Sequence, residues 1–233
     1  MTRLHAGCAD GRADGRAAVC AAVLDPLLAP AAARWRRTAL FAAASALCPA
    51  AWPAAVEVRV TDAGGRPLSS AVVFLESREA RAAVKPAAGV EIAQIERQFA
   101  PQVTVVPVGT AVSFPNRDSV RHHVYSFSPV KKLEIKLYVG TPAAPVVFDR
   151  PGIAVLGCNI HDNMTAWVVV VETPWYGQSG ADGRVAWPQV PPGTYRLLTW
   201  HPSLAPGAPA AEQALKVEAG ALLVAVKLTG AAP

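Results

Sequence analysis

A short loop between two apolar runs carries three side chains that bind soft metal ions. Cys158, His161 and Met164 are spaced three residues apart in the stretch Cys-Asn-Ile-His-Asp-Asn-Met. Thiolate and thioether sulfur favour copper(I), and imidazole accepts copper in either oxidation state. One loop supplies only part of a ligand set, so we expect a further ligand from elsewhere in the chain.

Two adjacent histidines, His122 and His123, lie upstream in the segment Asn116-Arg-Asp-Ser-Val-Arg-His-His-Val-Tyr. Neighbouring residues on a strand point to opposite faces, so only one of the two can face the loop. Two imidazoles, one thiolate and a weak axial thioether form the ligand set of a blue-copper electron-transfer centre. Zinc is the alternative metal, but zinc seldom binds a thioether. The residues therefore predict one type-1 copper site.

The first 55 residues are expected to be absent from the folded protein. Arg34-Trp-Arg-Arg is followed by the apolar run 38–47 and then by small residues and prolines up to Ala55. This order is typical of a secretory signal peptide, and the run is shorter than the about 20 residues of a membrane span. We interpret residues 1–33 as disordered or as a misassigned start. The mature chain is predicted to be periplasmic, with no integral membrane segment.

Removing the leader changes the charge and the cysteine count. From Val56 onward, 16 basic residues stand against 14 acidic ones, so the formal charge of +5 belongs largely to the leader. A nearly neutral chain has no electrostatic footprint for nucleic acid. Cys8, Cys20 and Cys48 leave with the leader, which makes Cys158 the only cysteine of the mature chain. It cannot form an internal disulfide, so it is either a metal ligand or a small buried hydrophobe.

Alternation of apolar and polar residues predicts an all-β protein without helices. Residues 56–76 read as a hairpin around the turn Asp62-Ala-Gly-Gly-Arg-Pro, and 77–89 reads as a loop or linker. The apolar run Thr165–Val171 is expected to be a strand buried on both faces. Short strands with a turn every eight to twelve residues are typical of β-sandwiches. Further strands are expected at 90–95, 102–107, 110–114, 133–139, 146–148, 153–156, 183–187, 194–200 and 213–228.

Several motifs in residues 89–171 match those of one family. They are Phe99-Ala-Pro101, Gly109-Thr-x-Val-x-Phe114, Asn116-Arg-Asp118, His122, Pro151-Gly152 and Cys158-x2-His161-x2-Met164. With them the region resembles a cupredoxin of the plastocyanin and amicyanin group, including methylamine-utilisation-type proteins. The resemblance implies a Greek-key β-sandwich that holds one type-1 copper ion. The ligands it implies are His122, Cys158, His161 and Met164.

The same resemblance favours His122 over His123, because the family pattern at this point is His-x-Val. The family usually has an asparagine after the ligand histidine, where it braces the ligand loops, and here that residue is His123. His123, Asn116 and Asn159 are therefore expected to support the ligands or to replace one of them.

The flanking segments have a resemblance of their own. Val58-x-Val-x-Asp-x-Gly-Gly-x-Pro-Leu and the later Pro192-Gly-Thr-Tyr-Arg-Leu resemble the carboxypeptidase regulatory-like (transthyretin-like) sandwich. We expect residues 56–88 and 172–233 to form the two halves of one small Ig-like sandwich. The cupredoxin region 89–171 would then be inserted into one of its loops.

Together these features predict a periplasmic copper protein that carries single electrons between redox partners. Its expected partners are redox proteins such as a c-type cytochrome or a periplasmic dehydrogenase, with no role for nucleic acid. The sequence shows no base, nucleophile or open metal position, so the protein is expected not to be an enzyme. Two alternatives are a periplasmic copper carrier or chaperone that exchanges the metal, and a β-sandwich binding module with a structural metal.

Overall fold

The computed structural model describes residues 53–233, and nearly all regular structure in this range is strand. The expectation of an all-β fold is confirmed. The predicted signal peptide, the leader and the cysteines at positions 8, 20 and 48 lie outside the described residues. Within residues 53–233, no helix has both the length and the apolar character needed to cross a membrane. The domain boundaries 56–88, 89–171 and 172–233 stay a prediction.

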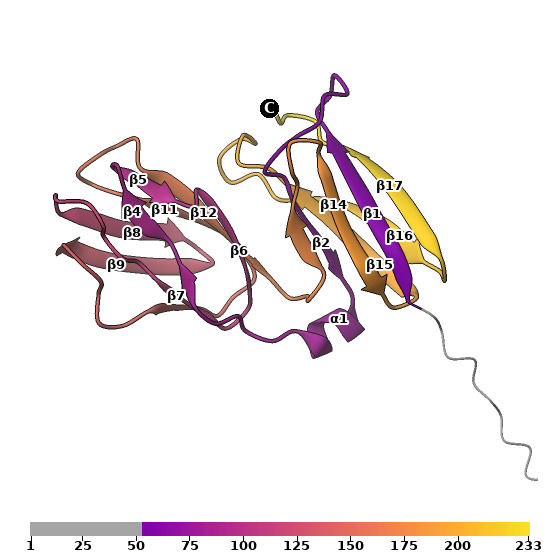
Figure 1. Cartoon of the computed structure of the whole chain (residues 1–233), viewed down its shortest axis with the longest axis horizontal. Coiled ribbons are helices and arrows are strands. Elements are labelled where there is room, and N and C mark those ends of the chain that lie inside the picture. The colour runs from indigo at the N-terminus through magenta and orange to yellow at the C-terminus, as the bar shows by residue number, and fades with distance from the viewer. Residues whose placement is uncertain (1–52) are drawn as a thin grey trace, which may run out of the picture. The chain divides into compact units, whose positions relative to one another are not determined.

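A five-stranded sheet carries the ligand loop (Figure 1). Its strands, in spatial order, are β6 (Val103–Pro107), β12 (Thr165–Val171), β11 (Gly152–Gly157), β8 (His122–Ser128) and β9 (Lys131–Tyr138). Strand β12 pairs antiparallel with β11 and parallel with β6. The loop 158–164 joins β11 to β12, so both of its ends are fixed by neighbouring strands of one sheet.

Two smaller sheets belong to the same part of the chain. They are formed by β10 (Val146–Phe148), β7 (Thr110–Ser113) and β3 (Val90–Glu91), and by β4 (Ala93–Ile95) and β5 (Gln98–Ala100). One buried apolar cluster joins residues of these strands to those of the five-stranded sheet. It includes Phe99, Val112, Phe114, Val124, Phe148, Leu156, Cys158, Met164 and Val168. The cysteine and the methionine of the loop therefore enter the core of this sandwich.

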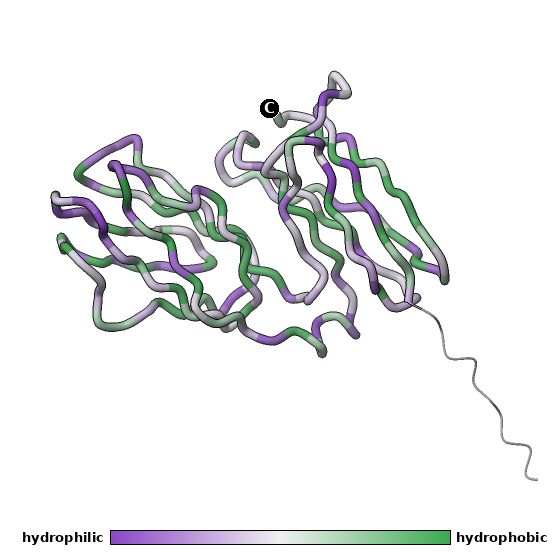
Figure 2. The backbone as a smooth tube through the Cα atoms, in the orientation of Figure 1, coloured by the Kyte–Doolittle hydropathy of each residue, from purple (hydrophilic) through white to green (hydrophobic). Residues whose placement is uncertain are grey.

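Two further sheets pair the start of the described chain with its end (Figure 1). One contains β14 (Arg184–Val190), β1 (Ala54–Thr61) and β17 (Ala221–Lys227); the other contains β13 (Tyr176–Gln178), β2 (Val72–Glu76), β15 (Gly193–Trp200) and β16 (Ala211–Val217). Strand β1 alternates buried and exposed residues, which Figure 2 shows as alternating green and purple. A second apolar core lies between these sheets, and it includes Val58, Leu68, Leu75, Trp187, Tyr195 and Leu197.

The hairpin predicted for residues 56–76 is wrong. Strand β1 pairs with β14 and β17, whereas β2 pairs with β13 and β15 in the other sheet. The connection between them closes only one bridge, between Thr61 and Pro67. Both strands carry apolar side chains on a buried face, so each gains more by lying in opposite layers of one core than by pairing with the other.

A short helix, α1 (Arg78–Ala83), replaces part of the predicted loop 77–89. Ser77 caps it, because its side-chain oxygen accepts a hydrogen bond from the backbone N–H of Ala80 at 3.0 Å. Six residues make fewer than two turns, so the helix leaves no repeating apolar pattern in the sequence. This is why the sequence prediction missed it.

Strand β12 is buried on both faces over its second half, as its sequence predicted. Val168 and Val170 belong to the apolar core that contains Cys158 and Met164, whereas Val169 and Val171 belong to a separate apolar cluster. That third cluster also contains Val72, Phe74, Leu198 and Trp200 from β2 and β15. A strand that carries apolar residues on both sides is thereby held rigidly, and it fixes the C-terminal end of the ligand loop.

Candidate metal centre

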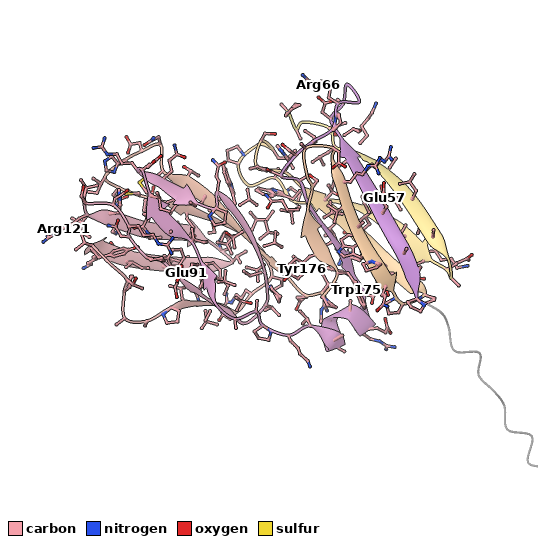
Figure 3. The ribbon with its side chains drawn as sticks, in the orientation of Figure 1. Glu57, Arg66, Glu91, Arg121, Trp175 and Tyr176 are labelled. Atoms are coloured by element: carbon pink, nitrogen blue, oxygen red, sulfur yellow. The ribbon has the colours of Figure 1, made fainter. Side chains whose placement is uncertain are left out.

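Strand alternation points the first of the two histidines inward. Arg121, just before β8, is exposed and its side chain points away from the strands (Figure 3). His122 is the first residue of β8 and its side chain is fully buried. On the neighbouring strand β11, Leu156 is buried and Gly157 is the last strand residue, so Cys158 continues the inward series.

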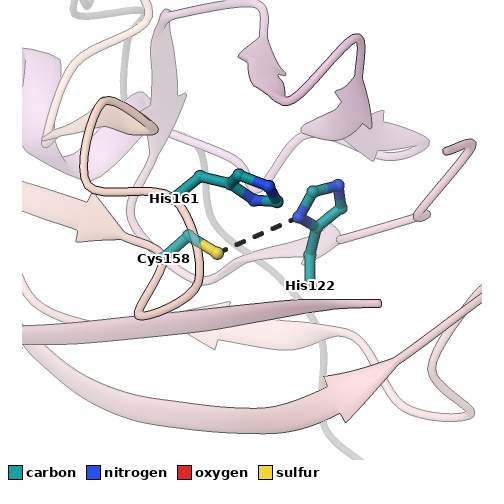
Figure 4. Close-up of side chains that lie close together, drawn as sticks. All are labelled: His122, Cys158 and His161. Carbon is teal, nitrogen blue, oxygen red and sulfur yellow. Dashed lines mark hydrogen bonds between the residues drawn. The ribbon is translucent and has the colours of Figure 1, made fainter. Parts of the chain in front are cut away.

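The structure brings His122, Cys158 and His161 together. One potential ligand atom of each residue lies within 4.8 Å of the other two. The sulfur of Cys158 is 3.9 Å from Nδ1 of His122, as the dashed line in Figure 4 marks. The two imidazole rings have their centroids 5.2 Å apart and are tilted by 60°. Two nitrogens and one sulfur from different parts of the chain thus converge on a single point.

The donor set fits a copper ion. Nδ1 of His161 is buried and has no hydrogen-bond partner among the described residues. A buried polar atom without a partner is costly, and coordination of a metal removes that cost. Met164 is buried in the same apolar cluster as Cys158, and its backbone N–H donates to the carbonyl of His161 at 3.0 Å. This turn folds the loop so that its thioether residue enters the core beside the cysteine.

The cysteine sulfur lies in a buried, weakly polar environment. Cys158 is only 3% exposed, and it is the only cysteine among the described residues. The backbone N–H of Ile160 donates to its sulfur at 3.5 Å. Hydrogen bonds to a ligand sulfur and the apolar surroundings are two means by which a protein tunes a copper–thiolate centre.

Asp118 holds the ring of His122 from the side opposite to the sulfur. One carboxylate oxygen lies 2.7 Å from Nε2 of His122, and the carboxylate also accepts the backbone N–H groups of Glu96 and Arg97. Burial alone would raise the pKa of Asp118, but the hydrogen bonds from Arg97, His122 and Glu96 outweigh it and hold the pKa below its usual range. The carboxylate fixes the ring so that Nδ1 faces the sulfur.

Asn116 braces the loop that leads to β8. Its side-chain amide donates to the carbonyl oxygens of Val120 and Tyr138, at 2.9 Å and 2.8 Å, and its own oxygen accepts the N–H of Asp118. A buried side chain that bridges three backbone groups holds the segment before His122 in one conformation. Asn116 therefore acts on the site through Asp118 and His122.

The remaining two candidates are His123 and Asn159. His123 points to the other face of β8, where its Nε2 lies 3.2 Å from a carboxylate oxygen of Glu134. It is absent from the group formed by His122, Cys158 and His161. Asn159 is exposed.

Asp118 is the site residue that the sequence analysis did not single out. It precedes His122 by four residues, but this spacing has no fixed geometry outside a helix. Only the fold of the loop between them brings the carboxylate onto the ring. The presence of an aspartate close to His122 in the sequence could nevertheless have indicated this role, since metal-binding histidines commonly donate their second N–H to a carboxylate.

Comparison with known proteins gives distant similarities. No protein-family model matches the chain. No curated protein matches it either. A purple cupredoxin from Nitrosopumilus maritimus is 21% identical, with 36% of this chain and 100% of that chain covered at a TM-score of 0.33. A reduced Cu(I) form of an amicyanin variant is 22% identical, with coverages of 42% and 98% and a TM-score of 0.34.

A third similar structure corrects one expectation. It is a Cu-containing nitrite reductase from Thermus scotoductus SA-01, 22% identical, with 49% of this chain and 28% of that chain covered at a TM-score of 0.34. This neighbour is an enzyme, so the expectation that the present protein is not an enzyme is wrong as an inference from sequence. Similarities at this level carry no functional argument, and the site is assigned from its own side chains.

Proposed function

We propose that the protein is an exported, periplasmic type-1 copper protein that transfers single electrons between redox partners. The observation that carries the proposal is the convergence of His122, Cys158 and His161 within 4.8 Å, with Nδ1 of His161 buried and without a hydrogen-bond partner among residues 53–233. His122 and His161 would bind copper through imidazole nitrogen, Cys158 through thiolate, and Met164 through its thioether as the weak axial ligand. Bound copper supplies a one-electron couple.

The protein's own contribution is to fix the ligands before the metal arrives. His122 is clamped between Asp118 and the cysteine sulfur, and the loop is fixed at both ends by β11 and β12. Rigid ligands favour electron transfer because little has to move between the two oxidation states. Burial of Cys158 keeps water and oxidants from the thiolate. Redox proteins such as a c-type cytochrome or a periplasmic dehydrogenase are the proposed partners.

A redox titration of copper-loaded variants tests this proposal. The wild-type protein is expected to lose and regain an intense thiolate-to-copper absorption band as one electron is added and removed. His122→Ala is expected to abolish the band, whereas His123→Ala is expected to retain it, because His123 faces away from the cluster. His201→Ala is a matched control, because His201 is a buried histidine whose ring is hydrogen-bonded to Ser203 and to the carbonyl of Ser69. This variant is expected to retain the band.

Two results would contradict the proposal. Equal loss of the band in the His122 and His123 variants would show that the assignment of the ligands is wrong. A colourless copper complex that releases the metal readily to a chelator would instead support the role of a copper carrier.

A further inference from the structure

The residue directly before the cysteine is covered by an aromatic ring. Gly157 is the cross-strand partner of Tyr125, and a Cβ atom at position 157 would lie 2.6 Å from Cζ and 2.7 Å from the hydroxyl oxygen of Tyr125. Its backbone does not adopt a positive φ, so conformation alone does not call for glycine. The absence of a side chain at 157 allows the ring to pack directly on the peptide unit that leads into Cys158.

Tyr125 is the middle member of a row of three rings that reaches the surface. His123, Tyr125 and Phe127 alternate along β8, so all three point to the outer face of the sheet. The ring centroids of His123 and Tyr125 are 5.7 Å apart, and those of Tyr125 and Phe127 are 5.2 Å apart. Phe127 is 78% exposed, and the nearby Val155 of β11 is 39% exposed. The row therefore runs from the backbone beside Cys158 to an apolar surface.

The strand next to this row carries unpaired positive charge. Lys132 is the cross-strand partner of Phe127, and Glu134 is that of Tyr125. Lys136 lies two residues further along β9 and is exposed, where the register with β8 shifts between Ile135 and Tyr138. Within residues 53–233, Glu134 contacts His123, whereas Lys132 and Lys136 form no ion pair. An anionic group that approaches Phe127 therefore meets two free ammonium groups.

We propose that Tyr125 and Phe127 form an electron port on the outer face of the five-stranded sheet, where a redox protein with an acidic surface docks. The inference rests on the proposed function and names a partner surface for the same site. Electronic coupling falls steeply with distance, and a ring in contact with the peptide before Cys158 shortens the path to the surface. Opposite charges steer two proteins together and orient them, so Lys132 and Lys136 would select an acidic partner.

The docking surface can be tested on the metal-free protein. Hexacyanochromate(III), an inert paramagnetic anion, serves as the probe, and line broadening of backbone amide signals reports where it binds. We expect selective broadening at residues 125–127 and 132–136, which is lost in the double variant Lys132→Glu, Lys136→Glu. Lys216→Glu is the control, because Lys216 is exposed elsewhere and already pairs with Glu218. Broadening that is strongest near Ile160, or a pattern the double variant leaves unchanged, overturns the port.

The electron path itself needs the copper-loaded protein. One electron passes from the reduced protein to hexacyanoferrate(III), which becomes hexacyanoferrate(II), and stopped-flow absorption gives the rate. Tyr125→Leu and Phe127→Ala are each expected to slow this reaction several-fold. Tyr125→Phe, which keeps the ring, and Leu223→Ala, at an exposed apolar position on β17, are expected to leave the rate unchanged. Unchanged rates in the Leu and Ala variants refute the path. Absence of a blue copper centre in the wild type would refute the proposed function, while the metal-free binding map would still decide the docking surface.

Discussion

Replacing Asp118 by asparagine tests how the fold prepares His122 for a metal. In the native site one carboxylate oxygen serves Nε2 of His122 at 2.7 Å and the N–H of Arg97 at 2.9 Å, and the other accepts the N–H of Glu96 at 2.7 Å. An asparagine side chain has only one acceptor oxygen, so one of these positions must face an NH₂ group. If the NH₂ group takes the place of the first oxygen, it faces Nε2 of His122 and the N–H of Arg97; if it takes the place of the second, it faces the N–H of Glu96. In both cases two donors face each other, so a hydrogen bond that holds the ring of His122 or the turn at 96–97 is lost.

The expected size of this effect follows from the role of the carboxylate. Loss of a carboxylate that orients a metal-binding histidine typically weakens metal affinity about 10- to 100-fold. Loss of hydrogen bonds to a charged group costs about 1.5–3 kcal/mol, so the metal-free protein is expected to be destabilised by a similar amount. Competition with a chelator of known copper affinity measures the first quantity, and denaturant unfolding of the metal-free protein measures the second.

Asp182→Asn is the matched control. Asp182 is an exposed turn residue that also accepts a backbone N–H, that of Arg184 at 3.1 Å, but it lies far along the chain from the cluster. We expect it to leave copper affinity unchanged. The reasoning would be refuted if Asp118→Asn bound copper as tightly as the wild type while the unfolding data showed it to be folded.

Three further predictions concern the surroundings of the cluster. Gly157→Ala is expected to lower the free energy of unfolding by about 1–3 kcal/mol, because the new Cβ atom overlaps the ring of Tyr125. Denaturant unfolding measures this loss, which should be smaller in a Tyr125→Leu background. Met164→Leu keeps the buried volume and is expected to lower the free energy of unfolding by less than about 1.5 kcal/mol. Voltammetry of the copper-loaded variant should show a changed reduction potential, because the axial thioether is lost. Burial raises the pKa of Tyr138 from 10.0 to about 12 against the opposing hydrogen bond from Gln94, so the folded state keeps a proton that the unfolded chain has lost. This contribution to stability is present below pH 10 and is lost as the pH rises through about 12, and Tyr138→Phe should remove that part of the pH dependence from unfolding curves of the metal-free protein.

The all-β character and the loop chemistry were readable from the sequence because they depend on local pattern. Alternation identified most of the strands, and the run Thr165–Val171 identified a strand buried on both faces. The spacing of Cys158, His161 and Met164 placed them in one loop. The preference for His122 came from a family resemblance, and strand alternation shows why its neighbour cannot share the site.

What the sequence could not supply was long-range pairing. Nothing local distinguishes a hairpin at 56–76 from two strands in opposite sheets, because the decision depends on partners more than 100 residues away at β14, β15 and β17. The contact of Tyr125 with Gly157 could not be predicted for the same reason, whereas the contact of Asp118 with His122 depends on the fold of the short loop between them. Each depends on a loop fold or a cross-strand register that only the assembled sheet defines.

The central claim is that His122, Cys158 and His161 hold one copper ion through a thiolate and two imidazoles. Its most direct test is the visible absorption spectrum of the purified protein loaded with one equivalent of copper(II), recorded beside that of Cys158→Ser. The account predicts an intense thiolate-to-copper charge-transfer band in the wild type and none in the variant. A colourless wild-type complex, or the same spectrum in both proteins, would contradict it.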